Sequence, residues 1–94
     1  MTAPSWTGGT AGGEGFARTA DQYELVVDGQ VVAVVGYEDR GSAIVLLHTA
    51  TEPGLRRRGY ATRLVAHALE DADARNLTVQ VRCPFVRAYL RNRA

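Results

Sequence analysis

The pattern of hydrophobic and polar positions divides the chain into an unpatterned N-terminal stretch and a strongly patterned remainder. From residue 21 onward, apolar residues first alternate with polar ones and later recur every three or four positions. Alternation is typical of strands and the longer period of helices. Residues 1–20 are rich in Gly, Thr and Ala, and such a stretch buries too little apolar surface to offset its ordering entropy. We expect a flexible tail over 1–20 and one domain over 21–94.

The first half of the domain predicts an antiparallel meander of three strands. Alternation over 23–27 is followed by Asp28-Gly29, the strongest short hairpin signal. Residues 31–37 are apolar on both faces, as expected of a central strand, and 42–49 follow as the third strand.

Strict alternation along the third strand assigns its side chains to two faces. His48 would share one face with Ile44 and Leu46, and Thr49 would lie on the other with Val45 and Leu47.

Helical spacing begins after a loop rich in Gly and Arg. Apolar residues over 60–74 form one stripe, and Asn76 is a C-terminal helix signal. Residues 77–81 alternate as a fourth strand, and Pro84 suits the first turn of a short closing helix. The polar face of the first helix would hold Arg63, Glu70, Asp71 and Asp73, and the buried side of the second Phe85, Val86, Tyr89 and Leu90.

The resulting order is β-β-β-α-β-α, a fold of the α/β (α+β) class. The last strand would lie parallel to the third through a right-handed crossover.

Composition narrows the function classes. The 94 residues allow one small domain, and a core of this size is marginal alone, so a homodimer would be unsurprising and the oligomeric state stays open. The chain has no Lys, which excludes Schiff-base and Walker-type chemistry. A net charge of +1 argues against a dedicated nucleic-acid binder, although Arg56-Arg57-Arg58 is a small basic cluster. One cysteine, no leader pattern and no apolar run of membrane-spanning length indicate a cytoplasmic protein.

The stretch from Gly54 to Ala61 carries the clearest chemistry. A Gly/Arg loop that opens a helix presents unpaired backbone N–H groups and the positive end of the helix dipole, which favour an anion. Tyr60-Ala61 stands where a nucleotide-hydrolysing P-loop needs Lys-Ser/Thr. The remaining alternatives are a pyrophosphate site and a plain strand-to-helix turn with solvated arginines.

This stretch resembles the acetyl-CoA signature Q/R-x-x-G-x-G/A of the GNAT N-acetyltransferase superfamily, at Arg56, Gly59 and Ala61. With Cys83-Pro84 near the end, the chain is most similar to small single-domain GNAT-like acetyltransferases from about residue 21 to 91. It departs from them at Arg57, often Gly there, and by ending before their His-Pro segment.

The resemblance implies a cofactor site made mainly of backbone. It implies that acetyl-CoA, without a metal, lies between splayed third and fourth strands. Its pantetheine arm would pair with backbone at Thr49 and Thr51. The pyrophosphate-binding stretch would comprise Arg56, Arg57, Arg58, Gly59, Tyr60, Ala61 and Thr62.

Three residues are candidates for catalysis, each with a structural alternative. Cys83, flanked by Arg82 and Arg87 at a helix start, is catalytic by resemblance or an inert buried thiol. His48 is a general base toward an amine or toward Cys83, or a hydrogen-bonded core residue. Tyr89 is the acid for the leaving thiolate, as in larger relatives, or packs in the core. His67 is expected at the solvated surface.

The predicted function is transfer of acetyl from acetyl-CoA to an amine, directly or through Cys83. The alternative from another class is a CoA- or acyl-CoA-binding module without catalysis. The acceptor, a small amine, a peptide or a protein, stays open.

Overall fold

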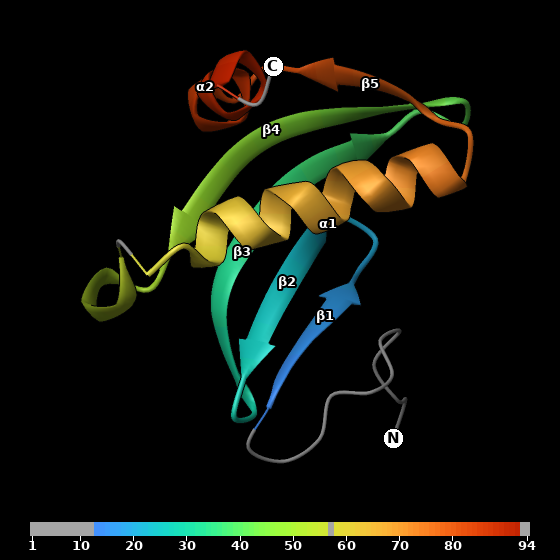
Figure 1. The fold of residues 1–94 in the computed structure, drawn as a ribbon. Helices are drawn as coiled ribbons and strands as arrows, with labels where there is room; N and C mark the ends of the chain where they lie inside the picture. Colours follow the sequence, from blue (N-terminus) through green and yellow to red (C-terminus); the bar gives the residue numbers. More distant parts are fainter. Residues whose placement is uncertain (1–12, 57, 93–94) are drawn as a thin grey trace, which may run out of the picture.

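The computed structural model describes residues 13–56 and 58–92. Within them, five strands form one mixed sheet in chain order, and α1 lies across one face of it (Figure 1). No helix in this part of the chain is long and apolar enough to cross a membrane. The elements are β1 (Glu14–Arg18), β2 (Gln22–Val27), β3 (Gln30–Asp39), β4 (Ala43–Thr51), the 3-10 turn η1 (Pro53–Leu55), α1 (Tyr60–Ala74), β5 (Thr78–Val81) and α2 (Pro84–Asn92).

The predicted meander and its parallel closing pair are confirmed. Asp28 and Gly29 both adopt positive φ, 51° and 82°, as the type I′ turn of a two-residue hairpin requires. β3 lies at the centre of the sheet between β2 and β4. β5 pairs parallel to β4, so the mixed α/β class holds.

β1 was not predicted, and the expectation of a flexible stretch is wrong for residues 14–18. This strand pairs antiparallel with β2 along its whole length. The Phe16 ring stacks on His67 of α1 at 4.1 Å, and Arg18 and Glu14 form ion pairs with Asp71 and Arg63. Ladder hydrogen bonds and these contacts offset the entropy that Gly-rich sequence loses on ordering. The remainder of the predicted tail, 1–12, lies outside the described residues.

α1 begins and ends where the sequence indicated. Its end is a Schellman motif: Asn76 takes a left-handed φ of 58°, its N–H donates to Asp73 O, and Leu77 N–H donates to Ala72 O. The apolar stripe of α1 packs on β2, β3 and β4 in one core cluster that also holds Cys83 and Val86. α2 therefore joins the same core as α1.

A bulge in β4 changes the face assignment that strict alternation predicts. Tyr37 pairs with Leu46 and Gly36 with His48, so Leu47 is an extra residue between two ladder positions. Thr49 pairs with Val35, a core residue, and therefore faces α1. His48 faces away from α1. The predicted faces of these two residues are wrong, because one inserted residue inverts the alternation beyond it.

Two residues of α1 also differ from expectation. His67 lies between the stacked ring of Phe16 and the edge of Tyr23, not at the solvated surface. Asp71 faces the sheet, where it accepts hydrogen bonds from Tyr23 Oη at 2.6 Å and from Arg18 and Arg75 at 3.1 Å. Burial, followed by the Asp71 hydrogen bond, raises the pKa of Tyr23 to about 12, which keeps it a proton donor.

Candidate functional site

The sheet opens between β4 and β5. The last paired residues are Leu46 and Val81, and the last hydrogen bond between the two chains runs from Arg82 N to Leu46 O. β4 continues to Thr51 while the other chain turns into α2, so residues 47–51 have no strand beside them on that edge among the described residues. This agrees with the splayed strands that the resemblance implies.

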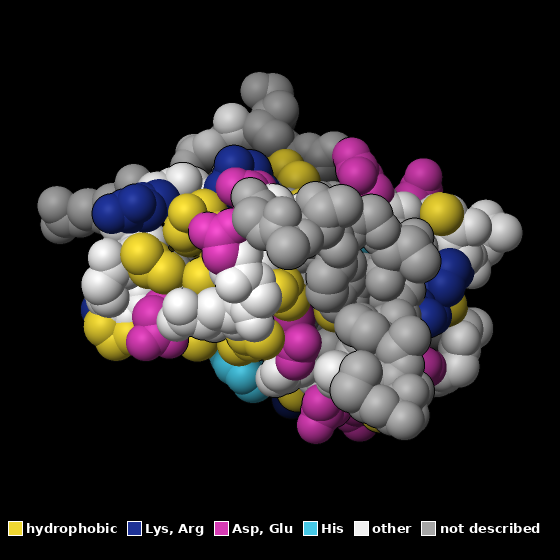
Figure 2. Space-filling view, turned by 90° about the horizontal axis from the view of Figure 1, so that it is seen from below, with side chains coloured by type: hydrophobic (Ala, Val, Ile, Leu, Met, Phe, Trp, Pro, Cys, Tyr) yellow, Lys and Arg dark blue, Asp and Glu magenta, His cyan; other side chains and the backbone are white. Residues whose placement is uncertain are grey.

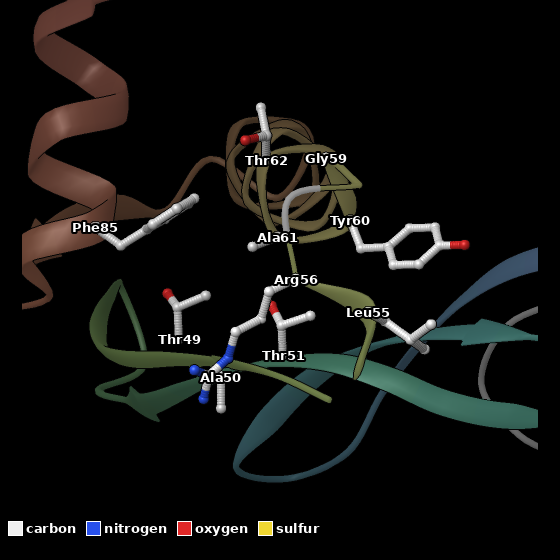
Figure 3. A pocket seen from close by; sticks show the side chains of 10 residues that line it. All are labelled: Thr49, Ala50, Thr51, Leu55, Arg56, Gly59, Tyr60, Ala61, Thr62 and Phe85. Atoms are coloured by element: carbon white, nitrogen blue, oxygen red, sulfur yellow. The ribbon is translucent and has the colours of Figure 1, made fainter. Parts of the chain in front are cut away.

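A cavity of about 440 Å³ lies beside the unpaired half of β4. Thr49 and Thr51 rise from β4, Thr62 and Ala61 come from the first turn of α1, and Phe85 closes the side next to α2 (Figure 3). Its full lining is Thr49, Ala50, Thr51, Leu55, Arg56, Gly59, Tyr60, Ala61, Thr62 and Phe85. Seven of the nine residues predicted for the cofactor site thus meet at one hollow; Arg58 does not line it, and Arg57 is outside the described residues.

The start of α1 leaves backbone N–H groups without a side-chain cap. Its N-cap, Gly59, has a left-handed φ of 77°, and no side chain caps the helix. The first intrahelical hydrogen bond runs from Arg63 N to Gly59 O, so the earlier N–H groups of the first turn have no intrahelical acceptor. These groups and the helix dipole favour negative charge at the cavity.

Arginines add positive charge at this end of the molecule. Figure 2 shows arginine beside hydrophobic side chains at the end where Figure 1 places η1 and the start of α1. Arg56 lines the cavity and Arg58 is exposed, and neither forms an ion pair within the described part of the chain. Arg63 is engaged differently, because it pairs with Glu14 at 2.8 Å and lies over the Tyr60 ring.

Cys83 lies at the start of α2 with its thiol in the core. Only 3% of the residue is exposed, and its Sγ is 3.2 Å from Thr49 Oγ1. Arg87, expected beside the thiol, instead donates hydrogen bonds to Val81 O. Cys83 is therefore separated from solvent but touches a residue that lines the cavity.

His48 and Cys83 lie on opposite faces of the sheet. Thr49, which touches the thiol, faces α1, whereas His48 is exposed on the other face. His48 therefore lies too far from the Cys83 thiol, across the sheet, to act as its base. Its other predicted role, as a base for an incoming amine, is compatible with its exposed position.

Tyr89 and Phe85 lie in the groove between α1 and α2. Tyr89 is half-buried and lines a hollow next to the main cavity, with Thr62, Phe85, Ala88 and Asn92, but does not line the main cavity itself. Phe85 was expected to be buried, yet 41% of it is exposed.

Sequence reasoning missed the role of Phe85 as a wall of the cavity. Helical periodicity identifies an apolar face but cannot distinguish packing against protein from lining a hollow. Among the described residues, no group of three or more His, Cys, Asp and Glu side chains could hold a metal ion.

The chain matches a known protein family over most of its length. The family model for a GCN5-related N-acetyl-transferase matches residues 22–94. No individual curated protein matches the chain. The matched range contains the whole cavity and both of its helices.

Proposed function

Because the chain belongs to the GCN5-related N-acetyltransferase family, we propose that it binds acetyl-CoA in the cavity beside β4 and transfers the acetyl group to an amine. One observation carries the proposal: an uncapped helix start and an unpaired strand edge line the same cavity of about 440 Å³. A pyrophosphate needs the first feature and the amide-bearing pantetheine arm needs the second.

Each part of the cavity has a task in this proposal. The free N–H groups at Tyr60, Ala61 and Thr62 would bind the pyrophosphate, with Arg56 and Arg58 adding charge. The exposed edge of β4 from Thr49 to Thr51 would pair with the pantetheine amides as an added strand does. The thioester would then lie at the opening between β4 and β5.

Direct attack by the acceptor fits the residues better than a covalent route. The acceptor nitrogen bonds to the acetyl carbon, the carbon–sulfur bond breaks, and the thiolate of CoA leaves. His48 would take the proton that the nitrogen loses, on the face opposite α1. A route through Cys83 would need its Sγ to attack first, yet this thiol is 3% exposed and His48 is on the other face.

The test is calorimetric titration with acetyl-CoA, followed by detection of free CoA thiol with a panel of primary amines and a lysine peptide. We expect binding and acetylation of at least one amine. Arg56→Ala should weaken acetyl-CoA binding about fivefold, the effect of losing about 1 kcal/mol. The matched control is Arg40→Ala, at an exposed arginine in the β3–β4 turn, and it should leave acetyl-CoA affinity unchanged.

Two results would count against the proposal. No binding at about 1 mM acetyl-CoA would overturn it altogether. Binding without any acetylated product would leave the alternative of a CoA-binding module.

The cytoplasmic location expected from the single cysteine is part of the same proposal.

A further inference from the structure

Three strands align Gln22, Gly36 and His48 in one row on the face opposite α1. Gln22 pairs with Gly36, and Gly36 pairs with His48. Paired residues of antiparallel strands project to the same face. Gly36 is buried and His48 exposed, so the histidine covers the glycine.

The His48 ring occupies the space that a side chain at position 36 would fill. A Cβ built on Gly36 would lie 2.2 Å from His48 Cε1 and 2.7 Å from each ring nitrogen. Real Cβ atoms essentially never approach another atom so closely, so the imidazole can take this place against β3 only because residue 36 is glycine.

The backbone itself does not require glycine at this position. The positive-φ glycines in the described part are Gly29, Gly41 and Gly59, and Gly36 is not one of them. Glycine inside a strand costs about 0.5–1 kcal/mol relative to alanine. Neither a turn nor a positive φ explains this glycine, which lies both at the bulge and against the His48 ring.

The bulge at Leu47 brings His48 to its place opposite Gly36. Without the extra residue, alternation would direct His48 into the core beside Ile44 and Leu46. Bulges commonly redirect a side chain next to a functional site. His48 follows Leu46 by two residues, at the point where pairing with β5 has ended.

The charged groups along this face include Glu24 and Glu38, and the exposed Arg82 follows Val81 where the pairing with β4 ends. Glu24, two residues along β2 from Gln22, accepts a hydrogen bond from the Gln22 amide at 2.6 Å. Glu38, two residues along β3 from Gly36, pairs with Arg40 at 3.3 Å. Beside His48, Val34 is half-exposed and Ala50 exposed, so an incoming molecule can reach the ring.

We propose that Gly36 is a positioning residue for acetyl transfer: by lacking a side chain, it holds the His48 imidazole on the face opposite the acetyl-CoA cavity, where the ring takes the proton of the acceptor amine. This rests on the proposed function.

The contact can be tested without any activity. In nuclear magnetic resonance spectra, the Gly36 Hα protons should be shifted by the His48 ring current, and His48→Ala should abolish that shift. In denaturation experiments, Gly36→Ala should destabilise the wild type but not the His48→Ala variant, because the second change removes the atoms that collide. Additive effects would overturn the contact.

The positioning role is tested with the panel amine that is acetylated fastest. Gly36→Ala should lower kcat about tenfold or more and alter the pH–rate profile, since a displaced base loses its alignment. Affinity for acetyl-CoA should be unchanged. In the His48→Ala background, Gly36→Ala should have no further effect on the rate. A folded Gly36→Ala variant with wild-type kcat and pH profile would overturn the proposal.

The two proposals fail in different ways. If the wild type neither binds acetyl-CoA nor acetylates an amine, the proposed function fails and the positioning role with it, even where the ring-current contact is found. If the wild type is active and His48→Ala has wild-type kinetics, the base role of His48 and the positioning role of Gly36 both fail, whereas binding of acetyl-CoA and acetyl transfer stand. Should Gly36→Ala not fold, the double variant compared with His48→Ala, together with the ring-current measurement, decides the contact.

Discussion

Thr49 and Cys83 meet at 3.2 Å where β5 gives way to α2. One lines the cavity and the other belongs to the core, so the contact joins the end of β4 to the start of α2. This contact lies at the point where the pairing of β4 with β5 has ended. The buried thiol therefore has a partner on β4 whether or not it forms a covalent intermediate.

Replacing Cys83 should accordingly leave acetyl transfer largely intact. Cys83→Ala removes no group that exchanges a proton with the substrates in the direct route. We expect a decrease far smaller than the roughly 10²–10⁴-fold contribution of a proton-transfer residue. Cys83→Ser, which keeps a hydrogen-bonding atom near Thr49, should be closer to wild type. Release of CoA thiol measures both.

The covalent route makes the opposite prediction for Cys83→Ala. Complete loss of activity while calorimetry still detects acetyl-CoA binding would contradict direct transfer and assign Cys83 as the nucleophile.

At the scale of elements, the two ends of α1 are set by residues with left-handed backbone. Asn76 ends the helix and satisfies its last carbonyls. Gly59 begins it, and its missing side chain leaves the first N–H groups uncapped. The same helix thus has a closed end and an end open to a ligand.

Gly59→Ala should weaken acetyl-CoA binding. A Cβ at position 59 meets no atom within 4 Å, but φ is 77°, which costs a non-glycine residue about 1–2 kcal/mol. Relief of that strain would change the path of the chain into α1, so we expect about a tenfold loss of affinity by calorimetry.

The matched control for this variant is Gly41→Ala. Gly41 has a φ of 81° and an equally open surrounding, but it lies in the turn at the other end of β4. It should lower stability to a similar degree and leave acetyl-CoA affinity unchanged. Equal loss of affinity in both variants would show that strain, not the site, is responsible.

On the scale of the whole molecule, β1 is held to α1 by contacts between residues about fifty positions apart. Phe16 stacks on His67, and the ion pair between Arg18 and Asp71 lies beside this stack. Burial is the largest influence on His67 and lowers its pKa below the ordinary 6.5, although the charges of Asp71 and Glu70 partly oppose it.

Stability should therefore fall as pH decreases below about 6.5, where the unfolded chain binds a proton at His67 more readily than the folded one. Urea unfolding at about pH 7.5 and about pH 5.5 measures the difference. His67→Phe keeps a ring to stack on Phe16 but cannot be protonated, so it should lose part of this pH dependence. Identical pH dependence in both proteins would contradict the prediction.

Much of the fold could be read from local signals. Asp28-Gly29, the period over 60–74, Asn76 and Pro84 each act through the backbone or through neighbours within one turn, so the sequence alone places them. The order of helices and of all strands but β1 follows from these signals, as does the position of the Gly/Arg loop before α1.

The features that the sequence did not predict, β1 and the bulge at Leu47, depend on pairing between strands. β1 exists because β2 and α1 offer partners to a stretch that is weak by composition. The bulge at Leu47 depends on register against β3, and it determines that Thr49 faces the cavity while His48 faces away. The sequence by itself determined the elements other than β1 and the Gly/Arg loop before α1, because both depend on neighbouring residues; the tertiary structure alone decided the faces of Thr49 and His48, because a single inserted residue inverts the alternation beyond it.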